Sequence, residues 1–176
     1  MQKHLEEVLE LYGDYLLRIA YTYVKDKRIA EEILQDVIFA YYRKHGQYRG
    51  EATLKTYLTR MTINRSYDHL RSWKNKKELL MKKIFDKDKS KSVEMCYIEN
   101  EEKLEITRIV FTLKVKQREI ILLYYYADHT TKEIAEILNK PESTIKSRLQ
   151  KARAELRGKL QDTDWEVLVD ENRKTF

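Results

Sequence analysis

The chain is poor in the residues that interrupt helices and in those that cross-link a fold. Its 176 residues include only four glycines and one proline, so the turn chemistry of a sheet protein is scarce and an all-helical fold is favoured. Cys96 is the only cysteine, which excludes an internal disulfide and favours a reducing compartment. No apolar run approaches the roughly 20 residues that span a bilayer, and Met1 is not followed by a signal-peptide core. We therefore expect a cytoplasmic protein that does not insert into membranes.

Residues that bind metals or carry out catalysis are also sparse. The four histidines and Cys96 are scattered through the chain without the spacing of metal ligands. There is no glycine-rich loop of the kind that cradles phosphates. The sequence thus predicts no enzyme, no catalytic residue, no metal site and no cofactor.

Charged residues, in contrast, are abundant. They make up 36% of the chain, and the formal net charge is +6, which favours an anionic partner. Hydrophobic residues make up 42%, enough to form real cores. The length suits one ordinary domain or two small ones.

The most informative stretch runs from Thr130 to Leu156, TTKEIAEILNKPESTIKSRLQKARAEL. Thr130 and Glu133 have the spacing of a capping box, which begins a helix. Asn139 and Pro141 suit a helix exit followed at once by a new first turn. Two helices joined by so short a turn predict a helix-turn-helix, whose second helix can enter the major groove of DNA.

The second helix of this motif is strongly basic. Residues 140–160 hold seven Lys or Arg and two Glu, a local charge of +5, as expected of a phosphate-contacting surface. A basic helix on its own is usually just a solvated surface, but the capped first helix and the turn favour sequence-specific DNA binding. We predict base contacts near Ser147 and Arg148. Phosphate contacts are predicted from Lys140, Lys146, Lys151 and Arg153.

Hydrophobic periodicity predicts three helices in the N-terminal half, over 3–24, about 29–44 and about 52–73. The second has an acidic front that is either a solvated face or a binding face. The third carries Tyr57, Asn64, Asp68 and Arg71 on one polar face between two apolar stripes, and Thr59, Arg60, Arg65 and Lys74 flank that face. Such a face is either solvated or supplies the aromatic and cationic groups that bind single-stranded nucleic acid.

The rest of the chain divides by charge. Residues 71–91 carry nine Lys or Arg against three Asp or Glu, and residues 92–107 carry one Lys against five Glu, which favours a mobile linker. Helices over 101–113 and 118–126 would complete a four-helix domain with the helix-turn-helix. The predicted organisation is a domain over 1–74, a flexible charged linker over 75–103, a domain over 104–160 and a tail over 161–176.

Both halves resemble one family. IAEEILQDVIFAYYRK and LKTYLTRMTINRSYDHLR, with the glycine-bounded loop between them, resemble the region 2 domain of bacterial RNA polymerase sigma factors. KQREIILLYYYADHTTKEIAEILNKPESTIKSRLQKARAEL resembles their region 4 domain. A chain with only these two domains is similar to the extracytoplasmic function (ECF) group of the sigma-70 family.

The resemblance implies roles for the matched positions. The residues that match the polymerase-docking segment are Glu31, Glu32, Leu34, Gln35 and Asp36. Those that match the loop and helix at the −10 element are Gln47, Tyr48, Arg49, Tyr57, Arg60, Asn64, Asp68 and Arg71. The helix that reads the −35 element is matched by Ser143, Thr144, Lys146, Ser147, Arg148 and Lys151.

The function implied is promoter recognition by a dissociable initiation subunit that also assists promoter melting. Its partners would be bacterial core RNA polymerase, duplex −35 and single-stranded −10 DNA, and an anti-sigma factor, often membrane-anchored, from which a stress response releases the chain. Two alternatives stay open from the residues alone. One is an autonomous helix-turn-helix regulator with a ligand-sensing N-terminal domain, and the other is a helical adaptor that binds only protein.

Overall fold

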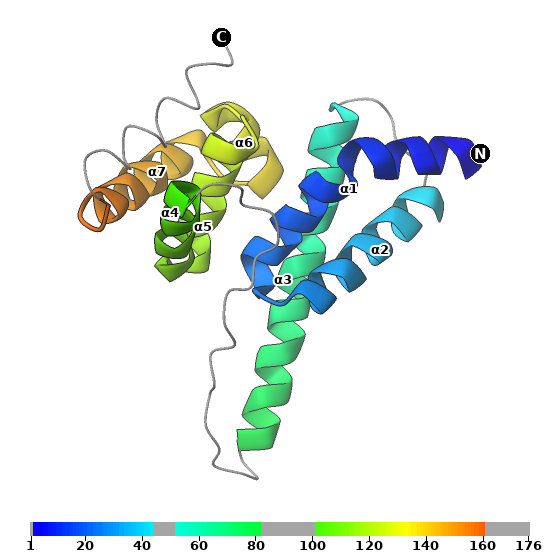
Figure 1. Cartoon of the computed structure of the whole chain (residues 1–176), viewed down its shortest axis with the longest axis horizontal. Helices are drawn as coiled ribbons and strands as arrows, with labels where there is room; N and C mark the ends of the chain where they lie inside the picture. The colour runs from blue at the N-terminus through cyan, green and yellow to red at the C-terminus, as the bar shows by residue number, and fades with distance from the viewer. Residues whose placement is uncertain (1, 44–51, 82–100, 161–176) are drawn as a thin grey trace. The chain divides into compact units, whose positions relative to one another are not determined.

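The computed structural model describes residues 2–43, 52–81 and 101–160, and all regular structure in these ranges is helical (Figure 1). The chain divides into two compact units, Met1–Ser92 and Val93–Phe176. The prediction of an all-α protein with two small helical domains is therefore confirmed.

The described residues of the first unit form a three-helix bundle. Its helices are α1 (Gln2–Val24), α2 (Lys27–Arg43) and α3 (Leu54–Met81), and each packs against the other two. The chain reverses between α1 and α2 in two residues. Lys25 takes the left-handed conformation with φ 55°, and the Asp26 carboxylate then accepts the Ile29 N–H at 3.1 Å, which begins α2.

Aliphatic and aromatic side chains of α1 and α2 form most of the core of this unit. Most of the buried positions recur at three- and four-residue steps. They are Val8, Leu16, Ile19, Ala20, Tyr21, Tyr23, Ala30, Ile33, Val37, Ile38 and Tyr41.

The face that α3 buries is different, because it is lined largely by hydroxyl side chains. Thr56, Thr59, Thr62 and Ser66 are all buried there beside Leu58 and Ile63. The Thr59, Thr62 and Ser66 hydroxyls donate to the carbonyl one turn earlier at 2.7–2.9 Å. The expectation that Thr59 flanks an exposed polar face is therefore wrong. Its hydroxyl also bonds the Tyr15 hydroxyl at 3.0 Å, and a hydroxyl with partners can be buried at little cost.

Both ends of α3 differ from the predicted span of about 52–73, the C-terminal end by two helical turns. Thr53 lies just before the helix, and its hydroxyl accepts the Thr56 N–H at 3.2 Å, as an N-cap does. At the other end the helix continues to Met81, into the segment predicted as linker. The intervening residues, KNKKELLM, include no Gly or Pro and are mostly good helix formers.

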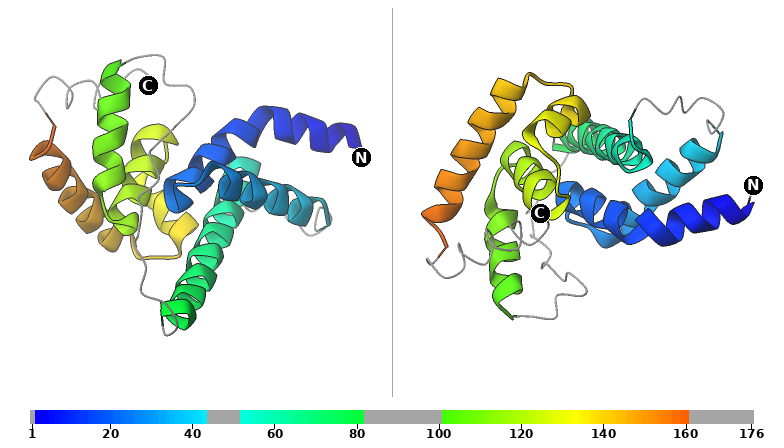
Figure 2. Two further views of the ribbon diagram at one scale, coloured as in Figure 1. Left: turned by 60° about the horizontal axis from the view of Figure 1, so that its bottom comes forward. Right: turned by 90° about the horizontal axis from the view of Figure 1, so that it is seen from above.

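The described residues of the second unit, 101–160, form four α-helices and one π-helical turn, and Figures 1 and 2 show their arrangement. They are α4 (Glu101–Thr112), α5 (Val115–Ile121), the π-helical turn η2 (Leu122–Tyr126), α6 (Thr131–Leu138) and α7 (Glu142–Arg157). Helix α7 packs mainly against α5 and α6. Its buried stripe is Ile145, Leu149, Ala152 and Leu156, as the sequence predicts.

The predicted helix over 118–126 begins three residues earlier and changes its winding in the middle. The Ala127 N–H donates to the Leu122 carbonyl at 2.9 Å, a step of five residues, and this wider turn defines η2. Asp128 then takes φ 56°, and the chain enters α6. The expectation of a four-helix domain around the helix-turn-helix holds.

A buried arginine joins α4 to α5, and sequence periodicity does not predict it. Arg118 is 2% exposed, and its Nη1 donates to the carbonyls of Phe111 at 3.2 Å and Leu113 at 3.1 Å. These carbonyls belong to the exit of α4, where a cation is electrostatically favoured. The guanidinium also lies 5.2 Å from the centroid of the Phe111 ring.

Candidate nucleic-acid and protein interfaces

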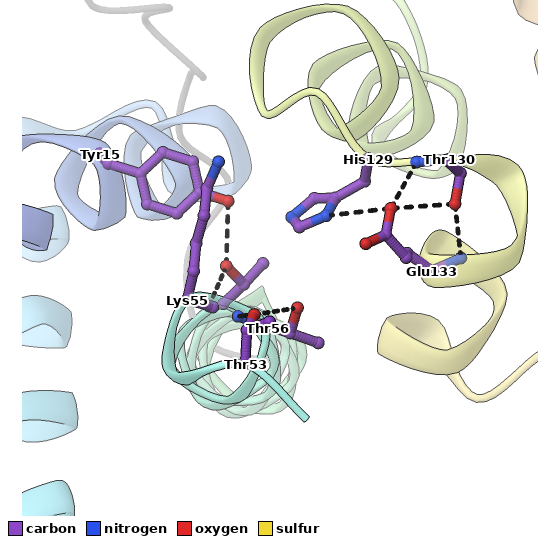
Figure 3. A network of polar contacts seen from close by, with 8 residues as sticks. Tyr15, Thr53, Lys55, Thr56, His129, Thr130 and Glu133 are labelled. Carbon is purple, nitrogen blue, oxygen red and sulfur yellow. Dashed lines mark hydrogen bonds and ion pairs between the residues drawn. The ribbon is translucent and has the colours of Figure 1, made fainter. Parts of the chain in front are cut away.

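The first helix of the helix-turn-helix begins with the predicted capping box. The Thr130 hydroxyl accepts the Glu133 N–H at 3.2 Å, and the Glu133 carboxylate accepts the Thr130 N–H at 2.8 Å (Figure 3). Glu133 also lies 3.9 Å from Nδ1 of His129. This histidine is 6% exposed, so it belongs to the interior of this unit.

The turn between α6 and α7 has the geometry that its residues predict. Asn139 ends α6 in the left-handed conformation, with φ 50° and ψ 56°. The Lys140 N–H then donates to the Ala135 carbonyl at 2.9 Å. Pro141 occupies the N-cap of α7 with φ −58°, and its carbonyl accepts the Thr144 N–H at 2.9 Å. The predicted helix-turn-helix is therefore fully formed.

A short polar chain ties the beginnings of α6 and α7 together. The Thr131 hydroxyl donates to Oε1 of Glu142 at 2.7 Å, and Nζ of Lys146 lies 3.0 Å from the same oxygen. The bond from Thr131, and then that from Lys146, hold the pKa of the Glu142 carboxyl below its usual range. One carboxylate thus links the two helices of the motif.

The solvent face of α7 carries most of the residues predicted to contact DNA. The exposed members are Ser143, Lys146, Ser147 and Lys151, and Gln150, which was not predicted, is exposed beside them. Lys140 in the turn is exposed as well, and Thr144 is half-buried. Sequence reasoning missed Gln150, although its spacing from Ser143, Ser147 and Lys151 was a usable signal. An amide side chain in this position has the donor and acceptor that an adenine edge requires.

Two arginines of the predicted DNA-reading set make contacts inside the protein. Nη1 of Arg148 lies 3.8 Å from Oε1 of the buried Glu119 in α5. Nε of Arg153 donates to the Tyr125 hydroxyl at 2.8 Å. Both arginines are partly buried, and sequence reasoning did not identify Glu119 or Tyr125 as their partners.

The acidic front of α2 is exposed, as a binding face requires. Glu31, Glu32, Gln35 and Asp36 lie in solvent, and Leu34 is half-buried. Three weak ion pairs accompany them: Lys27–Glu31 at 3.9 Å, Arg28–Glu32 at 3.7 Å and Arg65–Asp36 at 3.7 Å. Exposed pairs of this kind contribute little stability, so the carboxylates can exchange partners readily.

One aromatic residue extends this acidic front and was missed in the sequence. Phe39 follows Gln35 and Asp36 by one helical turn and is 61% exposed. The Arg43 guanidinium lies 5.7 Å from its ring centroid. An exposed aromatic next to exchangeable charges is typical of the residues that anchor protein–protein contacts.

The polar face predicted on α3 is largely present. Arg60, Asn64, Asp68 and Arg71 are exposed, and Tyr57 is half-buried. The Tyr57 ring makes an edge-to-face contact with the ring of Tyr41 in α2, with centroids 6.5 Å apart, and this contact helps to orient the phenol. The predicted loop residues Gln47, Tyr48 and Arg49 lie outside the described residues.

Within the described ranges, no three His, Cys, Asp or Glu side chains come together as a metal site. The helices described in these ranges also include none long and apolar enough to cross a bilayer.

Comparison with known families matches both units. The model for "Sigma-70 region 2" covers residues 8–76, and the model for "Sigma-70, region 4" covers residues 103–156. Together these matches span most of the chain, in the order that the sequence resemblance implies.

Curated relatives carry consistent names. The chain is 28% identical over 158 residues to the ECF RNA polymerase sigma factor SigM of Bacillus subtilis, covering 87% of this chain and 93% of that one. It is 26% identical over 152 residues to the ECF RNA polymerase sigma factor SigM of Mycobacterium tuberculosis, covering 86% and 74%.

Solved structures share the fold. The sigma factor RpoE from Bartonella quintana, solved in complex with the anti-sigma factor NepR, aligns with a TM-score of 0.70 at 20% identity, over 96% of this chain and 98% of that one. CnrH, solved in complex with the cytosolic domain of CnrY, aligns with a TM-score of 0.63 at 17% identity, over 90% and 88%.

Proposed function

The chain belongs to the sigma-70 family of RNA polymerase sigma factors, in the ECF group, and on this premise we propose how its two units divide the work of initiation. The first unit binds core RNA polymerase and the −10 element, and the second reads the −35 element. Sigma factors are transcription initiation factors, so the chemistry of RNA synthesis belongs to the polymerase. The observation that carries the proposal is a formed helix-turn-helix with a basic exposed face in a chain that also matches region 2.

We assign −35 recognition to the exposed face of α7. Lys140, Lys146 and Lys151 are exposed cations and would contact phosphates, which fix the register of a protein on the duplex. The first turns of α7 also carry Ser143, Thr144 and Ser147. The N-terminal residues of a recognition helix are the ones that contact base edges in the groove. Lys146 would exchange its Glu142 partner for a phosphate.

The −10 element is assigned to α3 and the loop before it. Arg60 and Arg71 supply exposed cations, and Asn64 and Asp68 supply hydrogen-bonding groups between them. Tyr57 supplies an aromatic plane for stacking, which contributes about 1–3 kcal/mol per base. Gln47, Tyr48 and Arg49 join this site through their match to the family's base-capturing loop. Stacking and loop contacts together would offset the few kcal/mol that unpairing and flipping a base costs.

Docking on core polymerase is assigned to the acidic front of α2. Glu31, Glu32, Gln35 and Asp36 are exposed beside Leu34, and their weak ion pairs leave them open to a basic partner surface. Phe39 lies next to this front and would add an apolar anchor. Holding both reading units on one polymerase raises their effective concentration on a promoter without new contacts.

Control by an anti-sigma factor is also proposed. Two structures that share the fold are RpoE in complex with the anti-sigma factor NepR and CnrH in complex with the cytosolic domain of CnrY. A partner of this kind would cover the α2 front or the α7 face and so prevent initiation. Action on polymerase and DNA implies that the chain works in the cytoplasm.

The proposal is tested by reconstituted transcription with core RNA polymerase, the full chain and a pool of promoter fragments. We expect selective initiation that requires the protein. Asp36→Arg should abolish polymerase binding, because it reverses a charge on the docking front, whereas Asp14→Arg, an exposed site on α1, is the matched control that should still bind.

The same assay tests the second unit. Lys151→Ala should leave polymerase binding intact, weaken promoter binding and reduce the salt dependence of binding by about one unit of slope. Lys116→Ala, an exposed lysine of α5, is its control. Tight binding of the purified chain to one duplex without polymerase, and no transcript, would support the autonomous regulator instead.

A further inference from the structure

The two partly buried arginines of α7 lie on opposite flanks of its buried stripe. Successive residues of an α-helix are separated by about 100°, so Arg148 and Arg153 fall about 70° to either side of the centre of the stripe formed by Ile145, Leu149 and Ala152. Neither arginine points along the solvent axis of α7. The residues on that axis are Ser143, Ser147 and Ala154, and all three are exposed.

On one flank, Arg148 makes an ion pair with α5. Its Nη1 lies 3.8 Å from Oε1 of Glu119, and the two side chains are 27% and 3% exposed. An ionised carboxylate is costly to bury unless a cation or hydrogen bonds compensate it. The Glu119 carboxylate therefore holds Arg148 toward α5. If Arg148 turned outward to a DNA base, the buried carboxylate would lose part of the charge that compensates it.

On the other flank, Arg153 packs on the tyrosines of η2. Nε donates to the Tyr125 hydroxyl at 2.8 Å, and the guanidinium lies 5.0 Å from the Tyr124 ring centroid and 5.5 Å from that of Tyr125. The two rings meet edge-on with centroids 5.0 Å apart. A planar guanidinium can stack and donate at once, which a lysine cannot do. Arg153 thus attaches α7 to the rest of the unit at a second point.

We propose that Arg148 and Arg153 are positioning residues that set the rotation of α7 about its own axis, and that the −35 bases are read by the strip Ser143, Ser147 and Gln150, with Lys151 beside it on the phosphates. This inference rests on the proposed function and changes the predicted role of both arginines. The small side chains on the solvent axis let the helix backbone approach the groove closely, while Gln150 and Lys151 flank them with longer polar groups.

The physical reason is that base readout is sensitive to rotation. A turn of about 20° moves a side-chain tip that lies about 5–6 Å from the helix axis by about 2 Å. Hydrogen-bond lengths vary by only about 0.5 Å, so such a turn breaks a bidentate base contact. Phosphate contacts from lysines tolerate such a rotation better, because the long lysine side chain is flexible and acts as a point charge. Loss of an anchor should therefore reduce base selectivity more than overall affinity.

The test uses the full chain with core RNA polymerase and a promoter library randomised over the −35 element. The variants are Arg148→Met, Glu119→Met and the double variant, because a buried ion pair can be replaced by apolar residues of similar volume. We expect Arg148→Met to lose about tenfold in −35 selectivity, with an unchanged salt slope. The double variant should recover most of the selectivity, because no buried charge is left without its partner.

If the double variant folds but is as unselective as Arg148→Met, and the salt slope falls by about one unit, Arg148 contacts DNA directly and the positioning role is wrong. Full selectivity of Arg148→Met would also overturn it. If Arg148→Met fails to fold, the comparison of the double variant with the wild type decides. If the wild-type chain directs no transcription, the proposed function fails, and this inference fails with it.

A second arm tests Arg153. Arg153→Lys keeps the charge but removes the planar fork, so it should lose selectivity, and Tyr125→Phe should lose less in the same direction. Arg157→Lys is the matched control, because Arg157 is exposed on the same helix. If Arg153→Lys behaves as the wild type, Arg153 acts as a simple charge and the positioning role is overturned at this residue.

Discussion

Helices α3 and α7 are both assigned to promoter DNA, yet they are held in their units by different chemistry. Helix α7 buries Ile145, Leu149, Ala152 and Leu156, a continuous apolar stripe, and is anchored at both flanks by arginines. The face that α3 buries includes Thr56, Thr59, Thr62 and Ser66, whose hydroxyls bond to backbone or to neighbouring side chains.

The difference shows two ways of orienting a helix. An apolar stripe is stabilised by its burial, which is favourable in proportion to area and insensitive to direction. Hydroxyl contacts contribute less free energy but have preferred geometry. We infer that α7 depends on its polar anchors for rotation, whereas α3 has part of its orientation built into its buried face.

The largest expected effect is on the apolar stripe. Ile145→Ala should lower the free energy of unfolding of the second unit by about 2–5 kcal/mol, because it removes a fully buried side chain and leaves a cavity. Native-state hydrogen exchange, which reports each unit separately, is the measurement. Ser147→Ala, on the exposed face of the same helix, should change stability by less than about 0.5 kcal/mol. Equal effects would show that α7 is not held by this stripe.

Substitutions of the buried hydroxyl residues of α3 should differ in their cost to stability. Thr59→Val should destabilise the first unit by about 1 kcal/mol, because the Tyr15 hydroxyl loses its 3.0 Å partner. Thr62→Val should cost less, because the Thr62 hydroxyl donates to the Leu58 carbonyl within the same helix. Hydrogen exchange of α1 and α3 distinguishes the two. A larger loss for Thr62→Val would contradict the directional role of the Tyr15–Thr59 contact.

The beginning of α6 gives an effect of similar size. Thr130→Ala should destabilise the second unit by about 0.5–2 kcal/mol, since it removes an N-cap side chain that accepts the Glu133 N–H. Glu133→Gln is the control and should cost less, because Gln also serves at this position of a capping box. Hydrogen exchange of the α6 amides, followed as denaturant is added, measures the stability of both variants. An unchanged stability for Thr130→Ala would show that α6 does not depend on its cap.

The smallest effect concerns pH. The pKa of the Glu142 carboxyl is lowered, chiefly by the bond from Thr131, so its stabilising contribution is present above the usual value of 4.5 and is lost as the pH falls through the lowered folded value. Glu142→Gln should therefore have a lower melting temperature than the wild type at neutral pH, with a difference that shrinks below pH 4.5. A difference that grows in acid would contradict this assignment.

The contrast between α3 and α7 also explains what the sequence could predict. Apolar periodicity and capping residues predicted α6, the turn at Asn139 and α7 almost residue by residue, because those signals are local. Thr59 was assigned to an exposed flank because a threonine on the helical wheel carries no sign that a tyrosine from another helix will bond it. The partners of Arg148 and Arg153 were missed for the same reason, since they depend on tertiary packing.

The central claim, that the two units read different promoter elements, is tested most directly by selection from a promoter library randomised at both elements. The full chain and core RNA polymerase would be used with Asn64→Ala in α3 and Ser147→Ala in α7, two exposed side chains. We predict that Asn64→Ala relaxes preference only at the −10 element and Ser147→Ala only at the −35 element. Relaxation of the same element by both variants, or of neither element by either variant, would contradict the account.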